Sequence, residues 1–281
     1  MSKKKQTVKS ILVALFSLVS LLAAQFAALL ICEPLTLLGV PVAVGNVAAT
    51  FLYILFAFLL AMLICKLSKT QMSDYRITKP KVKPVWAAAA IIMPLIVIAL
   101  SVISGAEWHS THFDRGSQAL LVSQILFISV GAGVVEELVF RGMIMGALEK
   151  FSNKAVAVIV PSVAFGAVHL MNGRLSVLSA VQLIVAGTAV GVLFSLVTIH
   201  SESVWSSSLM HIVWNFSVGG GLITIGSTVD ENAFFSLVLK NNSFLITGGE
   251  FGIESSIFSI AAYAVFIVIA LVLISRKEKH E

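Results

Sequence analysis

The sequence predicts an all-α membrane protein that crosses the bilayer about eight times. Of its 281 residues, 58% are hydrophobic and 12% are charged, against about 25% charged residues in soluble domains. The apolar segments are long and lack the two-residue alternation that the strands of a membrane β-barrel show. These two observations predict a single transmembrane domain over residues 1–281.

Eight apolar segments are expected to be the transmembrane helices. Most approach the ~20 residues needed to cross the hydrocarbon core of a bilayer. The segments are Ser10–Cys32, Gly45–Lys66, Val85–Ser104, Gln118–Leu148, Ala155–Leu170, Ser176–Ile199, Val204–Val218 and Ile257–Ser275. The first is too long for the apolar region of a signal peptide, so it is expected to remain a span. The fourth exceeds one untilted crossing and is expected to tilt, or to break near Gly131 and Gly133.

Basic residues predict how the helices are oriented. Fifteen of the 19 Lys and Arg residues lie in the N-terminal segment, the C-terminal tail and the loops after the second and fourth spans. Because cytoplasmic loops carry the excess of Lys and Arg, both termini are expected to be cytoplasmic. The net charge of +5 therefore reflects membrane orientation and not a nucleic-acid partner. Residues 219–256 are expected to form a loop on the opposite side.

Ionisable side chains inside the predicted spans are the strongest functional signal. A charge at the bilayer centre costs at least about 2.5 kcal/mol, so such residues mark functional sites. They are Glu136, Glu137, Arg141, His169 and His211. At 1.5 Å per residue, Glu136, His169 and His211 lie about 20, 21 and 12 Å from the cytoplasmic ends of their helices. This estimate permits one shared site.

The fourth span holds one acid that is paired and one that is not. Glu137 and Arg141 are four residues apart, so they share a helix face with the acid on the N-terminal side, the favourable order. This pair is expected to neutralise itself and to support the site structurally. Glu136 is rotated by about 100° and has no local cationic partner. We expect Glu136 to be the carboxylate that is free to act as a base.

Two further helices supply the histidines. His211 and Asn215 are also four residues apart, and both can donate hydrogen bonds without a net charge, as the stabilisation of an oxyanion requires. His169 comes from another helix and can hold a water molecule against Glu136. These four residues are the predicted catalytic set.

The order of these residues resembles the signature of a known family. Glu136-Glu137-x-x-x-Arg141, Phe165-x-x-x-His169 and His211-x-x-x-Asn215 are similar to the three motifs of the CAAX prenyl protease and bacteriocin-processing (Abi) family, which includes the type II CAAX prenyl endopeptidases. The resemblance covers about residues 118–219, the expected catalytic core.

The resemblance implies an eight-helix intramembrane endopeptidase of the glutamate type. In that family's scheme Glu136 activates a water, His169 helps to bind it, and His211 with Asn215 forms the oxyanion hole. Phe165 either lines the site or packs between helices, and Asn172 either lines the site or ends its helix. No cofactor is favoured, because neutral oxyanion donors explain the motifs without a metal. The alternative is zinc on Glu136, His169 and His211, which could form a site with an open position.

The function remains open among three classes at this stage. The first is an endopeptidase acting on a membrane-associated protein or peptide that enters from the bilayer or the cytoplasmic interface. The second is a non-catalytic membrane regulator or bacteriocin self-immunity protein. The third is a proton-coupled transporter, since buried Glu and His also form proton relays, although no inverted repeat is evident. The plasma membrane of a bacterium is the expected location.

Overall fold

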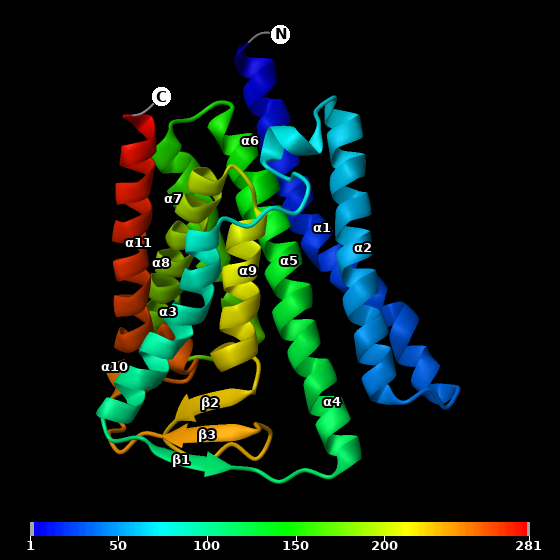
Figure 1. Ribbon diagram of the computed structural model, residues 1–281. Coiled ribbons are helices and arrows are strands. Elements are labelled where there is room, and N and C mark those ends of the chain that lie inside the picture. The colour runs from blue at the N-terminus through cyan, green and yellow to red at the C-terminus, as the bar shows by residue number, and fades with distance from the viewer. Residues whose placement is uncertain (1–2, 280–281) are drawn as a thin grey trace.

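The computed structural model describes residues 3–279 and confirms an all-α membrane domain (Figure 1). Its α-helices are α1 (Lys3–Leu37), α2 (Val42–Ser68), α3 (Pro84–Ile103), α4 (Arg115–Leu126), α5 (Ala132–Glu136), α6 (Met145–Glu149), α7 (Lys154–Val168), α8 (Val177–Ser201), α9 (Trp205–Trp214), α10 (Phe244–Thr247) and α11 (Ile257–Glu278). Shorter helical turns are the 3₁₀ helices η1 (Met72–Tyr75), η4 (His169–Asn172) and η6 (Ile253–Ser255) and the π-helices η2 (Phe127–Gly131), η3 (Glu137–Ile144) and η5 (Asn215–Gly219). The start of α1 and the end of α11 lie at the same end of the molecule, as the distribution of Lys and Arg predicts.

Seven of the eight expected spans are long and apolar enough to cross a membrane within residues 3–279. The expected seventh span, residues 204–218, is helical but is shorter than these seven helices. Its helix α9 has only 10 residues and continues into the five-residue π-helix η5. α9 packs against α3, α5 and α8, so it is an inner helix surrounded by the longer ones.

The long fourth span does not break at its glycines. Arg115–Glu149 is one helix of 35 residues, and Figure 1 shows it inclined through the molecule as α4, α5 and α6. Its irregularity takes another form, because η2 and η3 are π-helical. A π-helix widens a turn without ending the helix, and such turns are frequent at functional sites.

Residues 219–256 are more ordered than the expected loop. The strands β1 (Glu107–Ser110), β2 (Ile223–Gly226) and β3 (Phe235–Val238) form a small sheet in the order β1-β3-β2. β3 pairs antiparallel with β1 and parallel with β2. Figure 1 shows this sheet at the end of the molecule opposite the termini. Four-residue strands are too short for an alternation pattern to reveal them in the sequence.

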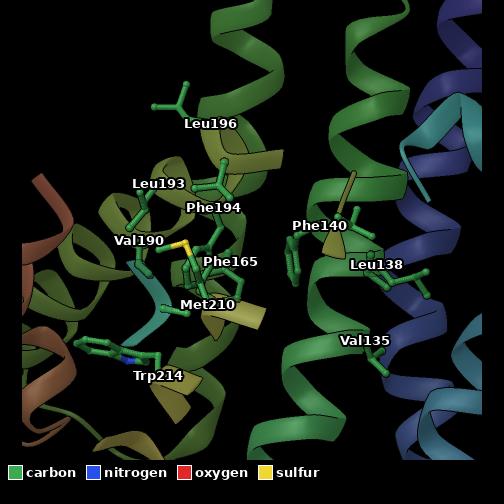
Figure 2. Close-up of a cluster of buried hydrophobic side chains, with 14 of the residues drawn as sticks. Val135, Leu138, Phe140, Phe165, Val190, Leu193, Phe194, Leu196, Met210 and Trp214 are labelled. Carbon is green, nitrogen blue, oxygen red and sulfur yellow. The ribbon is translucent and has the colours of Figure 1, made fainter. Parts of the chain in front are cut away.

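The core between η3, α7, α8 and α9 is built from large apolar side chains (Figure 2). Phe140, Phe165, Phe194 and Met210 are all buried. Since lipid is as apolar as these side chains, their close fit and the small residues between helices hold the helices together.

Glycines allow α7 and α8 to touch. A methyl group added to Gly187 would lie 2.6 Å from the Cα of Gly166, and one added to Gly191 would lie 2.7 Å from the Cβ of Ser162. Backbone contacts this close leave no room for a side chain. The contact matters for the site because α7 leads directly into His169.

We therefore expect Gly187→Ala to push α7 from α8 and to lower the stability by about 1–3 kcal/mol, the usual cost of overpacking. Gly173→Ala is the matched control, because a methyl group there meets nothing within 4 Å. Thermal unfolding of both variants in detergent would measure the difference. Equal melting temperatures would contradict the close contact between α7 and α8.

Candidate active site

Glu136 stands at the junction between two types of helix. It is the last residue of α5, and the π-helix η3 begins at Glu137. The Glu136 side chain is 18% exposed and lines a cavity of about 650 Å³ within the helical domain. Its Oε2 atom is buried and makes no hydrogen bond within the described part of the chain. Oε2 thus lies against protein atoms, and the exposed part of the Glu136 side chain faces the cavity.

Glu137 contacts both Arg141 and His211. Arg141 Nη1 donates to Glu137 Oε1 at 2.8 Å, and both side chains are almost completely buried. The same Glu137 oxygen lies 3.0 Å from His211 Nδ1. The sequence predicts the pair with Arg141, but the bond to His211 is a tertiary contact between helices. Glu137 therefore also fixes the orientation of the His211 ring.

Aromatic rings enclose the Arg141 guanidinium. Its Cζ lies 4.2 Å from the centroid of the Phe165 ring and 5.3 Å from that of Phe194. Such contacts stabilise a cation whose water has been removed. These ring contacts add to the ion pair with Glu137, because Arg141 Nη2 is buried and makes no hydrogen bond within residues 3–279.

The bond to Glu137 determines what His211 offers to the cavity. A carboxylate only accepts hydrogen bonds, so His211 Nδ1 must carry a proton. His211 Nε2 faces Glu136 Oε2 at 3.8 Å, and it can donate only if the ring is an imidazolium.

His169 is held by its own helix. Its Nδ1 lies 2.7 Å from the carbonyl oxygen of Phe165, one turn earlier. Because a carbonyl accepts hydrogen bonds, Nδ1 is the donor here, and an imidazole with its single proton on Nδ1 has Nε2 as an acceptor. The Phe165 ring also packs against the imidazole, with centroids 4.7 Å apart. Phe165 thus positions His169 with both its ring and its carbonyl.

Asn215 is the first residue of η5 and lines the same cavity. Its Nδ2 donates to the carbonyl oxygen of Ile128 at 3.0 Å. Ile128 belongs to the π-helix η2, in which the regular α-helical hydrogen bonds are displaced. This bond leaves the second hydrogen of the amide for another acceptor.

The structure brings the predicted catalytic residues together. Glu136, His169, His211 and Asn215, from four helical segments, all line the cavity of about 650 Å³, as does Phe165. Glu137 and Arg141 lie behind them, buried. The side chain of Asn172 lies outside the described part of the structure.

The cavity is also lined by residues that were not singled out from the sequence. Trp214 Nε1 donates to Glu254 Oε1 at 2.7 Å, and the Tyr263 hydroxyl donates to the Glu254 carbonyl at 3.2 Å. Glu254 and Phe251 come from the segment between the sheet and α11 and line the cavity together with Tyr53 of α2. A single acid in a polar segment has no spacing that could have marked it in the sequence.

The zinc alternative would use Glu136, His169 and His211 as ligands. Within residues 3–279, no group of three or more His, Cys, Asp or Glu side chains is placed so that it could hold a metal ion. His211 Nε2 is near Glu136, but His169 does not complete a three-ligand set with them.

Comparison with known families agrees with the motifs. Residues 118–217 match the family model described as Type II CAAX prenyl endopeptidase Rce1-like. The match contains all of the predicted catalytic residues. It excludes α1, α2 and the segment with Phe251 and Glu254, which complete the cavity wall. No curated protein matches the chain.

Proposed function

Starting from its membership of the type II CAAX prenyl endopeptidase family over residues 118–217, we propose that this protein is an intramembrane endopeptidase of the glutamate type. The observation that carries the proposal is the convergence of Glu136, His169, His211 and Asn215 on one cavity inside the membrane domain. A base, a water-binding acceptor and two oxyanion donors are what the hydrolysis of a peptide bond requires.

Glu136 and His169 activate the water. The Glu136 carboxylate takes one proton, and His169 Nε2 accepts a hydrogen bond from the other hydrogen. The oxygen attacks the carbonyl carbon of the scissile bond, and the carbonyl oxygen becomes an oxyanion. Glu136 then transfers its proton to the leaving amine as the carbon–nitrogen bond breaks. This step returns the carboxylate to its starting state.

His211 and Asn215 stabilise the oxyanion. Proton transfer moves negative charge from Glu136 to the substrate oxygen. His211 Nε2, at 3.8 Å from Glu136 Oε2, is close to where that charge forms. Preformed donors in a site without bulk water contribute more than they would in water. Glu137 and Arg141 act through His211. Glu137 accepts a hydrogen bond from His211 Nδ1, and Arg141 in turn donates to Glu137.

The substrate is proposed to be a membrane-associated protein or peptide. The long apolar helices mark a multi-pass membrane protein, and a cavity within such a domain is reached from the bilayer or from the cytoplasmic interface. An unmodified peptide precursor or membrane protein is the first class to test, and a protein with a lipid-modified C-terminus, which the family match suggests, is the second. The proposed location is the plasma membrane of a bacterium.

The direct test compares the termini of membrane peptides in cells that produce the wild-type protein or Glu136→Ala. The proposal is supported by new peptide termini that appear only with the wild type. The purified protein should generate the same termini from a synthetic peptide that contains the cleaved sequence. A farnesylated peptide with a CAAX terminus and its unmodified form distinguish the two substrate classes. The absence of any terminus that depends on Glu136 would overturn the proposal.

A prediction about His211 separates oxyanion binding from metal binding. We expect His211→Asn to retain measurable hydrolysis at about 10²–10³-fold lower rate, the usual cost of one oxyanion donor. We also expect elemental analysis of the purified wild-type protein to find no stoichiometric zinc. Zinc at about one ion per chain, lost together with activity on chelation and restored with it, would contradict this mechanism.

A further inference from the structure

A second cavity lies between α1 and α2, away from the active site. It has a volume of about 880 Å³, within the range of about 300–1,000 Å³ that is typical of small-molecule sites. Leu12 and Phe16 of α1 face Leu63 and Leu67 of α2 across it. Each of these four side chains is between 46% and 75% exposed. The protein itself does not fill this groove.

The groove follows from the distribution of side-chain sizes along the two helices. Ala24, Ala28 and Ala49 are almost fully buried, and small side chains let helices approach closely. Toward the N-terminus α1 instead carries large side chains and lysines. Figure 1 shows α1 and α2 close together near the loop that joins them and farther apart toward the termini.

One end of the groove is positively charged. Lys4 and Lys9 line it, and neither forms an ion pair with any residue in the part of the chain that the structure describes. α1 has 35 residues and is therefore about 52 Å long, longer than the ~30 Å hydrocarbon core. The lysine end of α1 thus reaches the headgroup region, while the apolar part of the groove remains in the hydrocarbon.

We propose that this groove binds an anionic phospholipid, with an acyl chain between α1 and α2 and the headgroup phosphate at Lys4 and Lys9. Positive-inside orientation accounts for lysines at this end but not for the apolar groove next to them. Basic pockets between transmembrane helices are a recognised type of site for anionic headgroups. The combination of a long apolar slot and two unpaired cations matches an anionic phospholipid better than a zwitterionic one.

The site shares a helix with the catalytic cavity. Val19 and Ala23 of α1 line the lipid groove, whereas Leu21 and Gln25 line the cavity that contains Glu136. α1 is therefore a wall common to both spaces. The lipid site does not depend on the proposed chemistry, and it can be tested without a substrate.

Native mass spectrometry of the full-length protein can test this site. The detergent-solubilised protein is mixed with equal amounts of phosphatidylglycerol and phosphatidylcholine, and the retained lipid is counted. We expect one phosphatidylglycerol per chain, retained about 30-fold better than phosphatidylcholine if each of two lysines contributes the usual surface attraction. Lys4→Gln/Lys9→Gln should remove the preference. The matched control is Lys79→Gln/Lys81→Gln, which removes the same charge from an exposed loop.

Leu63→Trp tests the groove itself without changing any charge. The added bulk should displace the acyl chain and reduce the retained phosphatidylglycerol, while Glu136 and its neighbours stay untouched. Three results would overturn the proposal: equal retention of the two lipids by the wild type, equal loss in both lysine variants, or a dimer of the protein that Leu63→Trp dissociates. The last would mean that a second copy of the chain covers the groove.

Discussion

Glu136→Ala is expected to abolish peptide hydrolysis and to leave the fold intact. The substitution removes the only proposed base, and general-base catalysis contributes about 10²–10⁴-fold to a rate. The fold should tolerate the change because Glu136 Oε2 makes no hydrogen bond within residues 3–279. The measurement is the rate at which the purified variant generates the new peptide termini, together with its melting temperature.

Two further variants make this result specific. Glu136→Gln keeps the shape of the side chain and should be as inactive as alanine, because a carboxamide cannot take the proton. Glu33→Ala removes an exposed carboxylate of α1 and should hydrolyse at the wild-type rate. Wild-type cleavage by a well-folded Glu136→Ala protein would end the glutamate mechanism.

Arg141→Ala should damage the fold as well as the chemistry. It would leave Glu137 as a buried charge without its cation, which typically costs about 3–5 kcal/mol. It would also loosen His211, which Glu137 holds through Nδ1. We expect a lower yield, a lower melting temperature and no hydrolysis.

The control for Arg141 is Arg76, which pairs with Glu149 at 2.6 Å in a more exposed position, with side-chain exposures of 25% and 22%. Ion pairs accessible to water contribute about 0–1 kcal/mol, so Arg76→Ala should cost much less. Glu137→Gln/Arg141→Met should recover much of the stability, because both charges of the buried pair are removed together. Equal melting temperatures for Arg141→Ala and Arg76→Ala would contradict the importance of the buried pair.

Local patterns account for the part of the fold that could be predicted. The length of an apolar segment determines whether its helix can cross a bilayer, and seven of the eight expected spans meet this condition. The expected span at 204–218 is also helical but shorter, because α9 ends at Trp214 and continues only into the π-helix η5. α9 is enclosed by α3, α5 and α8, so its apolar character reflects contact with protein.

The sheet and the cavity wall could not be predicted for a related reason. The partners in the sheet are distant along the chain: Glu107 of β1 pairs with Val238 of β3. Glu254 reaches the cavity because Trp214 and Tyr263 hold its side chain and its carbonyl. Such placements depend on how helices and loops pack, and no periodicity in the segment itself encodes them.

The sequence by itself determined the helical membrane class, the three motifs and the Glu137–Arg141 pair, because each follows from spacing along one helix or from hydrophobicity along one segment. Only the tertiary structure decided that Glu137 also binds His211, 74 residues away in the chain. That contact determines which nitrogen of His211 carries a proton and what the ring presents to the cavity. A hydrogen bond between helices depends on their relative rotation and depth, and packing fixes both.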